Sequence, residues 1–178
     1  GVDNILRRVY LFQLGPNKRY QPDLLTEILP HELTHLVLQE YFGERQMPRA
    51  LNEGLAMYME TGNRARKYDW KAYEAAKRNR HFKLADLYNA FGYPRDKNRI
   101  WRFYSQSASV TRFMVDRLEP AQMAAAFDQL KHGRSMQHAL QTATGRPDDV
   151  LASIEKLWRE AILKNPPPKP KKQVAPKD

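Results

Sequence analysis

The segment His31-Glu32-Leu33-Thr34-His35 contains the H-E-x-x-H pattern, whose residue types and spacing suit a catalytic zinc site. Residues four apart lie on one face of a helix, so both imidazoles can bind one ion at Zn–N distances of about 2.0–2.1 Å. The carboxylate of Glu32 can then reach a metal-activated water and take its proton. Because so short a pattern also arises by chance, the alternative is a helix with two incidental histidines.

A second segment, residues 51–56 (Leu-Asn-Glu-Gly-Leu-Ala), offers a third ligand in Glu53. Seventeen residues separate His35 from Glu53, enough for a helix end, a loop and the start of an antiparallel helix. Two histidines and one glutamate leave the fourth zinc position open for water, as a catalytic site requires. Gly54 costs about 1 kcal/mol relative to alanine inside a helix. Either a close backbone approach near the metal or a local kink would explain it.

The apolar periodicity predicts two helices that position these residues, over about 22–42 and 48–61. Pro30 lies inside the first pattern and is expected to kink or divide the helix just before His31. A strand is predicted over about 5–14, where β-branched and aromatic residues precede a Gly-Pro-Asn turn signal. Elsewhere the sequence predicts a short apolar turn over 84–88, a polar loop over 92–98, and helices over about 65–80, 100–118, 120–132, 135–143 and 147–164.

Composition limits the remaining chemistry. The 178 residues suffice for one domain with a hydrophobic core, and the absence of cysteine excludes disulfides, zinc ribbons and thiol nucleophiles. No apolar run approaches the length of a transmembrane helix. The aromatic residues between 70 and 93, Tyr93 among them, are expected to line the core and a cleft. Residues 165–178, rich in proline and lysine, are predicted to form an extended tail or linker.

The two segments together resemble the gluzincin metallopeptidases, and most closely the peptidase-MA-like proteins and the thermolysin-like catalytic domain of M1 aminopeptidases. The resemblance covers about residues 25–163 and implies that His31, His35 and Glu53 hold one Zn²⁺ ion. M1 enzymes usually have one more residue between the second histidine and the glutamate. The fold implied is α+β and mainly α. It is a zincin-like domain over 1–164, with a small N-terminal β element and a helical C-terminal half.

Residues 104–110 (Tyr-Ser-Gln-Ser-Ala-Ser-Val) are similar to the segment of these families that carries an oxyanion-stabilising tyrosine, which implies a catalytic role for Tyr104. Thermolysin-like enzymes place a histidine-orienting aspartate four residues after the ligand glutamate, but that position is Met57 here. Asn52 and Glu60 are the candidates for orienting the ligands, and the alternative for Glu60 is a solvated helix end. The amine-binding Gly-x-Met-Glu-Asn pattern of M1 exopeptidases is absent from the sequence, which leaves aminopeptidase activity unsupported.

Three functions remain open at this stage. The first is a zinc metallopeptidase that cuts peptide or protein substrates, with Glu32 as general base. The second is a non-catalytic zincin-like binding module. The third is a basic binder of nucleic acid or envelope polymer, since a net charge of +10 fits an acidic partner as well as a solvated surface, although no clear nucleic-acid motif occurs. A chain that begins at Gly1 suits a removed leader, so an extracytoplasmic location is expected.

Overall fold

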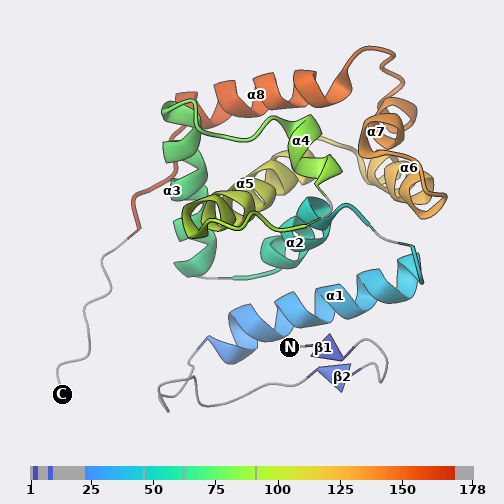
Figure 1. Ribbon diagram of the computed structural model, residues 1–178, viewed down its shortest axis with the longest axis horizontal. Helices are drawn as coiled ribbons and strands as arrows, with labels where there is room; N and C mark the ends of the chain where they lie inside the picture. Colours follow the sequence, from blue (N-terminus) through green and yellow to red (C-terminus); the bar gives the residue numbers. More distant parts are fainter. Residues whose placement is uncertain are drawn as a thin grey trace.

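The computed structural model describes residues 2–3, 8–9, 23–45, 47–61, 63–90 and 92–170, and these residues are mainly helical (Figure 1). Two-residue strands β1 (Val2–Asp3) and β2 (Arg8–Val9) pair antiparallel and lie against the first long helix. The mainly α part of the predicted fold class is confirmed. The predicted strand over 5–14 is not seen at that length, because only Arg8–Val9 of it lies within the described residues.

The histidines lie on α1 (Leu29–Phe42), which follows a π-helical segment, η1 (Leu24–Ile28). The hydrogen-bonding pattern therefore changes just before Pro30, as the sequence predicts. Pro30 occupies the first turn of α1, where its missing N–H costs nothing. α1 ends at Gly43, whose positive φ of 63° is a conformation that favours glycine.

Glu53 lies on α2 (Arg49–Tyr58), which packs against both α1 and α5 (Lys97–Val115). A Cβ atom on Gly54 would lie 2.1 Å from Thr111 Oγ1 and 2.7 Å from the carbonyl oxygen of Ser107. Gly54 is therefore explained by a close approach, as one of the two sequence interpretations expected. The neighbour is α5, however, and not a metal ligand.

The remaining helices pack around α2 and α5, and they differ from the predicted helices mainly at their ends. The segment predicted as an apolar turn forms a helix, because its side chains at 84, 87 and 88 are buried in the core. The loop predicted over 92–98 ends early, because the Asp96 side chain caps α5 by accepting from the Arg99 N–H at 2.9 Å. The other helices are α3 (Asn63–Lys77), α4 (Leu84–Asn89), α6 (Pro120–Lys131), α7 (Met136–Thr144) and α8 (Val150–Lys164).

Polar contacts inside the core fix the position of α5. Gln106 accepts from the Phe82 N–H and donates to the Phe82 carbonyl, both at 2.7 Å. The Trp158 Nε1–H of α8 donates to Ser109 Oγ at 3.0 Å.

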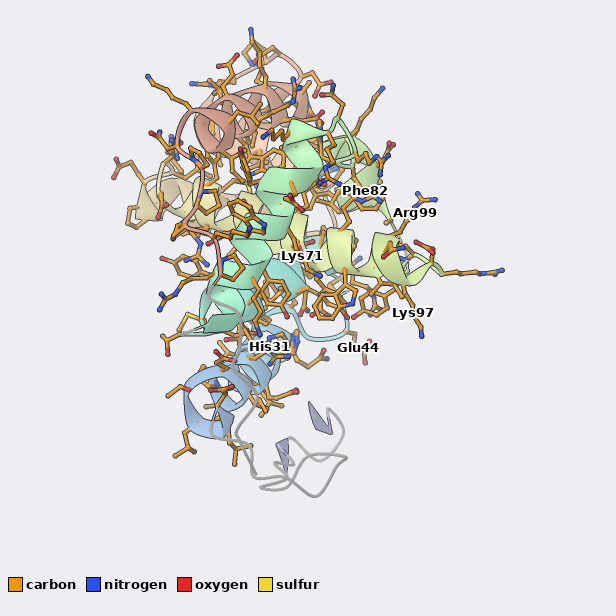
Figure 2. All side chains as sticks on the ribbon, turned by 90° about the vertical axis from the view of Figure 1, so that its left-hand side faces the viewer. His31, Glu44, Lys71, Phe82, Lys97 and Arg99 are labelled. Carbon is orange, nitrogen blue, oxygen red and sulfur yellow. The ribbon has the colours of Figure 1, made fainter. Side chains whose placement is uncertain are left out.

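Figure 2 shows His31 between α1 and the rest of the helical body, while Lys97 projects from the N-terminal end of α5. Within the described residues, no helix has the length and apolar character needed to cross a membrane.

Candidate metal centre

Three side-chain atoms from α1 and α2 converge on one point. Nε2 of His31 lies 3.1 Å from Nε2 of His35, and Oε2 of Glu53 lies 3.8 Å and 3.9 Å from these two nitrogens. Atoms that each lie about 2.0–2.1 Å from a tetrahedral zinc are separated by about 3.3 Å. The three atoms therefore have nearly the spacing of a zinc ligand set, and among the described residues they form a group able to hold a metal ion.

His31 is oriented by Glu60, which lies just beyond the end of α2. Glu60 Oε1 accepts from Nδ1 of His31 at 2.8 Å, and the Glu60 side chain is buried. The structure thus places Glu60 against the candidate ligand His31 and not at a solvated helix end. A carboxylate that accepts the far ring N–H of a histidine holds the near nitrogen toward the metal and raises its basicity.

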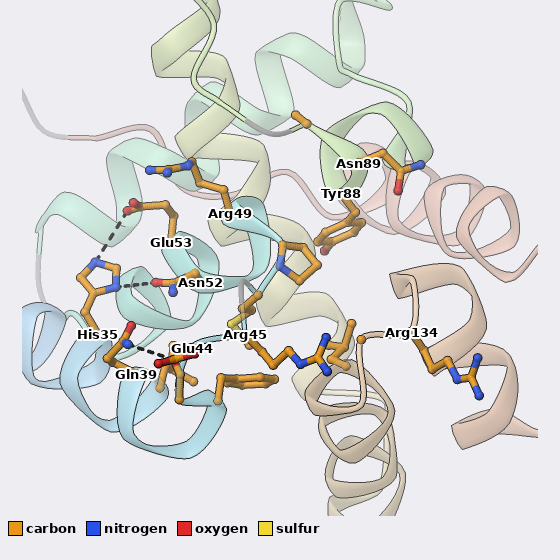
Figure 3. A pocket seen from close by; sticks show the side chains of 18 residues that line it. His35, Gln39, Glu44, Arg45, Arg49, Asn52, Glu53, Tyr88, Asn89 and Arg134 are labelled. Atoms are coloured by element: carbon orange, nitrogen blue, oxygen red, sulfur yellow. Dashed lines mark hydrogen bonds and ion pairs between the residues drawn. The ribbon is translucent and has the colours of Figure 1, made fainter. Parts of the chain in front are cut away.

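His35 is oriented in the same way by Asn52, at 2.5 Å between Nδ1 and Oδ1 (Figure 3). Asn52 precedes Glu53 on α2, so a single helix turn supplies both a ligand candidate and the residue that orients another. With Nδ1 of each ring donating, a neutral imidazole has its lone pair on Nε2.

Glu53 has a partner of its own that the sequence analysis missed. The Tyr93 hydroxyl donates to Oε1 of Glu53 at 2.5 Å, which leaves Oε2 directed at the histidines. The guanidinium of Arg49 lies 4.4 Å above the Tyr93 ring. The sequence predicts Tyr93 only as part of the core or cleft wall. Its segment has no helical or strand period that would have placed it beside α2.

The donor set itself fits a metal. Two imidazole lone pairs and one carboxylate oxygen face each other, and each ligand candidate has its opposite polar atom engaged by another side chain. Such electron-rich atoms repel one another unless a cation lies between them. Neutral imidazole and carboxylate are ligands that suit zinc.

The two catalytic candidates, Glu32 and Tyr104, line a cavity of about 490 Å³ that also contains His31 and Glu53. Glu32 enters it from α1 and Tyr104 from the first turns of α5. Burial raises the pKa of Tyr104, and the nearby Tyr93 and Glu53 raise it further. The phenol of Tyr104 therefore keeps its proton at neutral pH, and it shares a side-chain hydrogen bond with Tyr93.

Fold and site together define a helical domain with a candidate metal centre of two histidines and one glutamate on facing helices. Residues 22–164 match the Peptidase MA superfamily, and the match includes α1, α2 and α5. The chain belongs to this superfamily, which confirms the resemblance noted from the sequence. A search of curated proteins and a search of solved structures each found no match.

Proposed function

We propose that this protein is a zinc-dependent peptidase that hydrolyses peptide bonds, with His31, His35 and Glu53 as the metal ligands. The observation that carries the proposal is the convergence of His31 Nε2, His35 Nε2 and Glu53 Oε2 in a chain of the Peptidase MA superfamily. Zinc held by these atoms would supply a water with its pKa lowered to about 7 and would polarise the carbonyl of the cut bond.

Glu32 is proposed as the general base. It follows His31 directly in the chain and lines the same cavity, so a peptide bond placed in that cavity lies within its reach. Its carboxylate takes the proton of the attacking water and returns it to the leaving amine. A carboxylate that carries out these two proton transfers must not itself be a metal ligand. Glu32 is not in the ligand group of His31, His35 and Glu53.

Tyr104 is proposed to stabilise the oxyanion that forms when the carbonyl is attacked. Tyr104 lines the cavity that contains His31 and Glu53, and its raised pKa keeps the phenol protonated and able to donate. A donor that is already in place where negative charge develops lowers the barrier without reorganisation. Three further residues are proposed to position the metal ligands, because each hydrogen-bonds a ligand candidate: Glu60, Asn52 and Tyr93.

The test combines metal content with hydrolysis. The zinc-loaded chain should contain about one zinc per molecule by plasma emission, as a three-residue ligand set implies. It should cut peptides from a quenched fluorescent library. Glu32→Gln should abolish cutting and leave the zinc content unchanged, because only the base is lost. His35→Ala should lose both.

Two outcomes would contradict the proposal. Hydrolysis retained by Glu32→Gln would remove Glu32 from the mechanism. A protein that binds zinc through these residues and cuts no peptide in the library would favour the non-catalytic binding module.

A further inference from the structure

A second and larger cavity, of about 810 Å³, adjoins the His35 side of the candidate metal centre (Figure 3). It is lined by His35, Asn52 and Glu53, whereas the smaller cavity is lined by His31, Glu32 and Glu53. Glu53 therefore belongs to both cavities. A peptide that crosses the metal centre would extend from one cavity into the other.

Three arginines from separate segments line the larger cavity. Arg45 comes from the turn after α1, Arg49 from the start of α2, and Arg134 from the turn after α6 (Figure 3). Arg45 Nη1 lies near Gly133 of the opposite wall, since a Cβ added there would be 3.3 Å from it. Within the described part of the chain, no carboxylate lies at ion-pair distance from any of the three guanidinium groups.

The two cavities differ in charge. The larger one has the three arginines against Glu44 and Glu53, and Glu53 is already committed to the metal centre and to Tyr93. Among its described lining residues, the smaller one has three carboxylates and one arginine, Arg64. Two of these carboxylates, Glu53 and Glu60, are likewise engaged at the candidate metal centre, and the other walls are mostly apolar or aromatic. Its charged and aromatic lining is Glu32, Glu53, Glu60, Arg64, Tyr68, Trp101 and Tyr104.

We propose that the arginine-lined cavity is a substrate subsite that takes a carboxylate, either an acidic side chain or the free C-terminus of a peptide. The inference rests on the proposed function, since it names the substrate class for the same site. Guanidinium groups match a carboxylate in shape and can bind it through paired hydrogen bonds. The same carboxylate in the smaller cavity would meet Glu32 and Glu60, so the charge difference also orients the peptide across the metal.

The test is peptide binding to the zinc-loaded Glu32→Gln chain, measured by fluorescence anisotropy so that cutting does not interfere. Three peptides of equal length share one core sequence. One carries an internal glutamate and an amidated C-terminus, one has a free C-terminus and no acidic side chain, and one has glutamine with an amidated C-terminus. We expect one or both carboxylate peptides to bind about five- to tenfold more tightly than the neutral peptide, as charge-assisted hydrogen bonds would give.

Variants locate the effect. Arg45→Gln with Arg134→Gln, added to Glu32→Gln, should reduce the ratio of acidic to neutral affinity to about one, because two of the three cationic groups are lost. Arg146→Gln is the matched control, since Arg146 is exposed in the turn between α7 and α8, away from both cavities. It should keep the full ratio. The ratio should also fall as salt is raised, because the arginines are exposed to solvent.

A glutamate moved along the amidated peptide sharpens the test. Affinity should rise only where the glutamate lies on the side of the metal centre that faces the three arginines. It should not rise on the other side, where Glu60 lies and position 32 carries a neutral glutamine in this chain. Equal affinity for all three peptides would overturn the subsite. A preference for acidic peptides that survives in the double arginine variant would also overturn the subsite. The same holds if an added oligonucleotide displaces all three peptides equally.

Failure of the subsite and failure of the proposed function give different results. If the unmodified protein, which retains Glu32, cuts neutral and acidic peptides at equal rates, the proposed peptidase function stands and the proposed subsite is wrong. No cutting of any peptide, together with an arginine-dependent preference in binding, would leave the subsite in place and remove hydrolysis.

Discussion

The buried carboxylate of Glu60 accepts a hydrogen bond from Nδ1 of His31 at 2.8 Å, although the two residues are 29 positions apart in sequence. The contact depends on the chain just after α2. The backbone N–H and side-chain hydroxyl of Thr61 both donate to the Thr26 carbonyl, at 3.1 Å and 3.0 Å. This joins the end of α2 to η1 and brings Glu60 under the first histidine.

Replacing Glu60 should therefore weaken zinc binding without removing a ligand. Glu60→Ala is expected to lower zinc affinity by about 10–100-fold, the usual effect of losing a carboxylate that orients a metal-binding histidine. Glu60→Gln should lose less, because its amide oxygen can still accept from Nδ1. Competition with a chromophoric chelator measures the affinity. Glu160→Ala, at an exposed position of α8, is the control, and an equal loss in that variant would contradict the role of Glu60.

The ligand candidates could be predicted from the sequence because helical geometry alone brings residues 31 and 35 together. Glu53 could be predicted because a loop of suitable length joins two helices. Glu60 was a candidate because it lies seven residues after Glu53 and would share its face on a continuous helix. α2 ends at Tyr58, so Glu60 reaches His31 through a bend in the chain and not along a helix face. Tyr93 was missed since tertiary packing, with no local period, brings it to Glu53.

The two tyrosines near Glu53 should have separable effects. Tyr104→Phe is expected to lower kcat by about 100- to 1000-fold, the usual cost of removing one oxyanion donor, with little change in zinc affinity. Tyr93→Phe removes the hydrogen bond to Oε1 of Glu53 and should chiefly weaken zinc binding. Steady-state kinetics and chelator competition on both variants make the comparison. The same pattern of losses in both variants would contradict the separate roles.

Gly54 sets the distance between α2 and α5, and hence between Glu53 and Tyr104. Gly54→Ala gains about 1 kcal/mol of helix propensity, but its methyl group would overlap Thr111 and Ser107. Overpacking of a close contact costs about 1–3 kcal/mol, and at these distances we expect the upper part of that range. Urea unfolding should show a net loss of stability, about 1–2 kcal/mol on these figures.

Gly92→Ala is the control for this prediction, because an added Cβ there has no heavy atom within 4 Å. Adding Thr111→Ala to Gly54→Ala should restore part of the stability. It removes the 2.1 Å overlap with Oγ1 but leaves the 2.7 Å overlap with the Ser107 carbonyl. Full stability in Gly54→Ala alone would show that α2 and α5 can move apart without cost.

The buried carboxyl of Glu27 should make stability depend on pH. Its side chain in η1 is 1% exposed, and although Oε1 accepts from the Arg64 N–H at 3.2 Å, burial raises its pKa above the ordinary 4.5. Between that ordinary value and the raised native value, the unfolded chain has lost the proton that the native protein keeps. The contribution of Glu27 to stability is therefore present below about pH 4.5 and is lost as pH rises through this window.

Glu27→Gln removes the ionisation and should still accept from the Arg64 N–H through its amide oxygen. Relative to the unmodified protein, the variant should gain stability as pH rises from about 4.5 toward neutrality. Urea unfolding of both proteins across this range measures the difference. Glu160→Gln, an exposed change, should give a curve parallel to that of the unmodified protein. Parallel curves for Glu27→Gln as well would mean that the Arg64 interactions offset the burial of the charge completely.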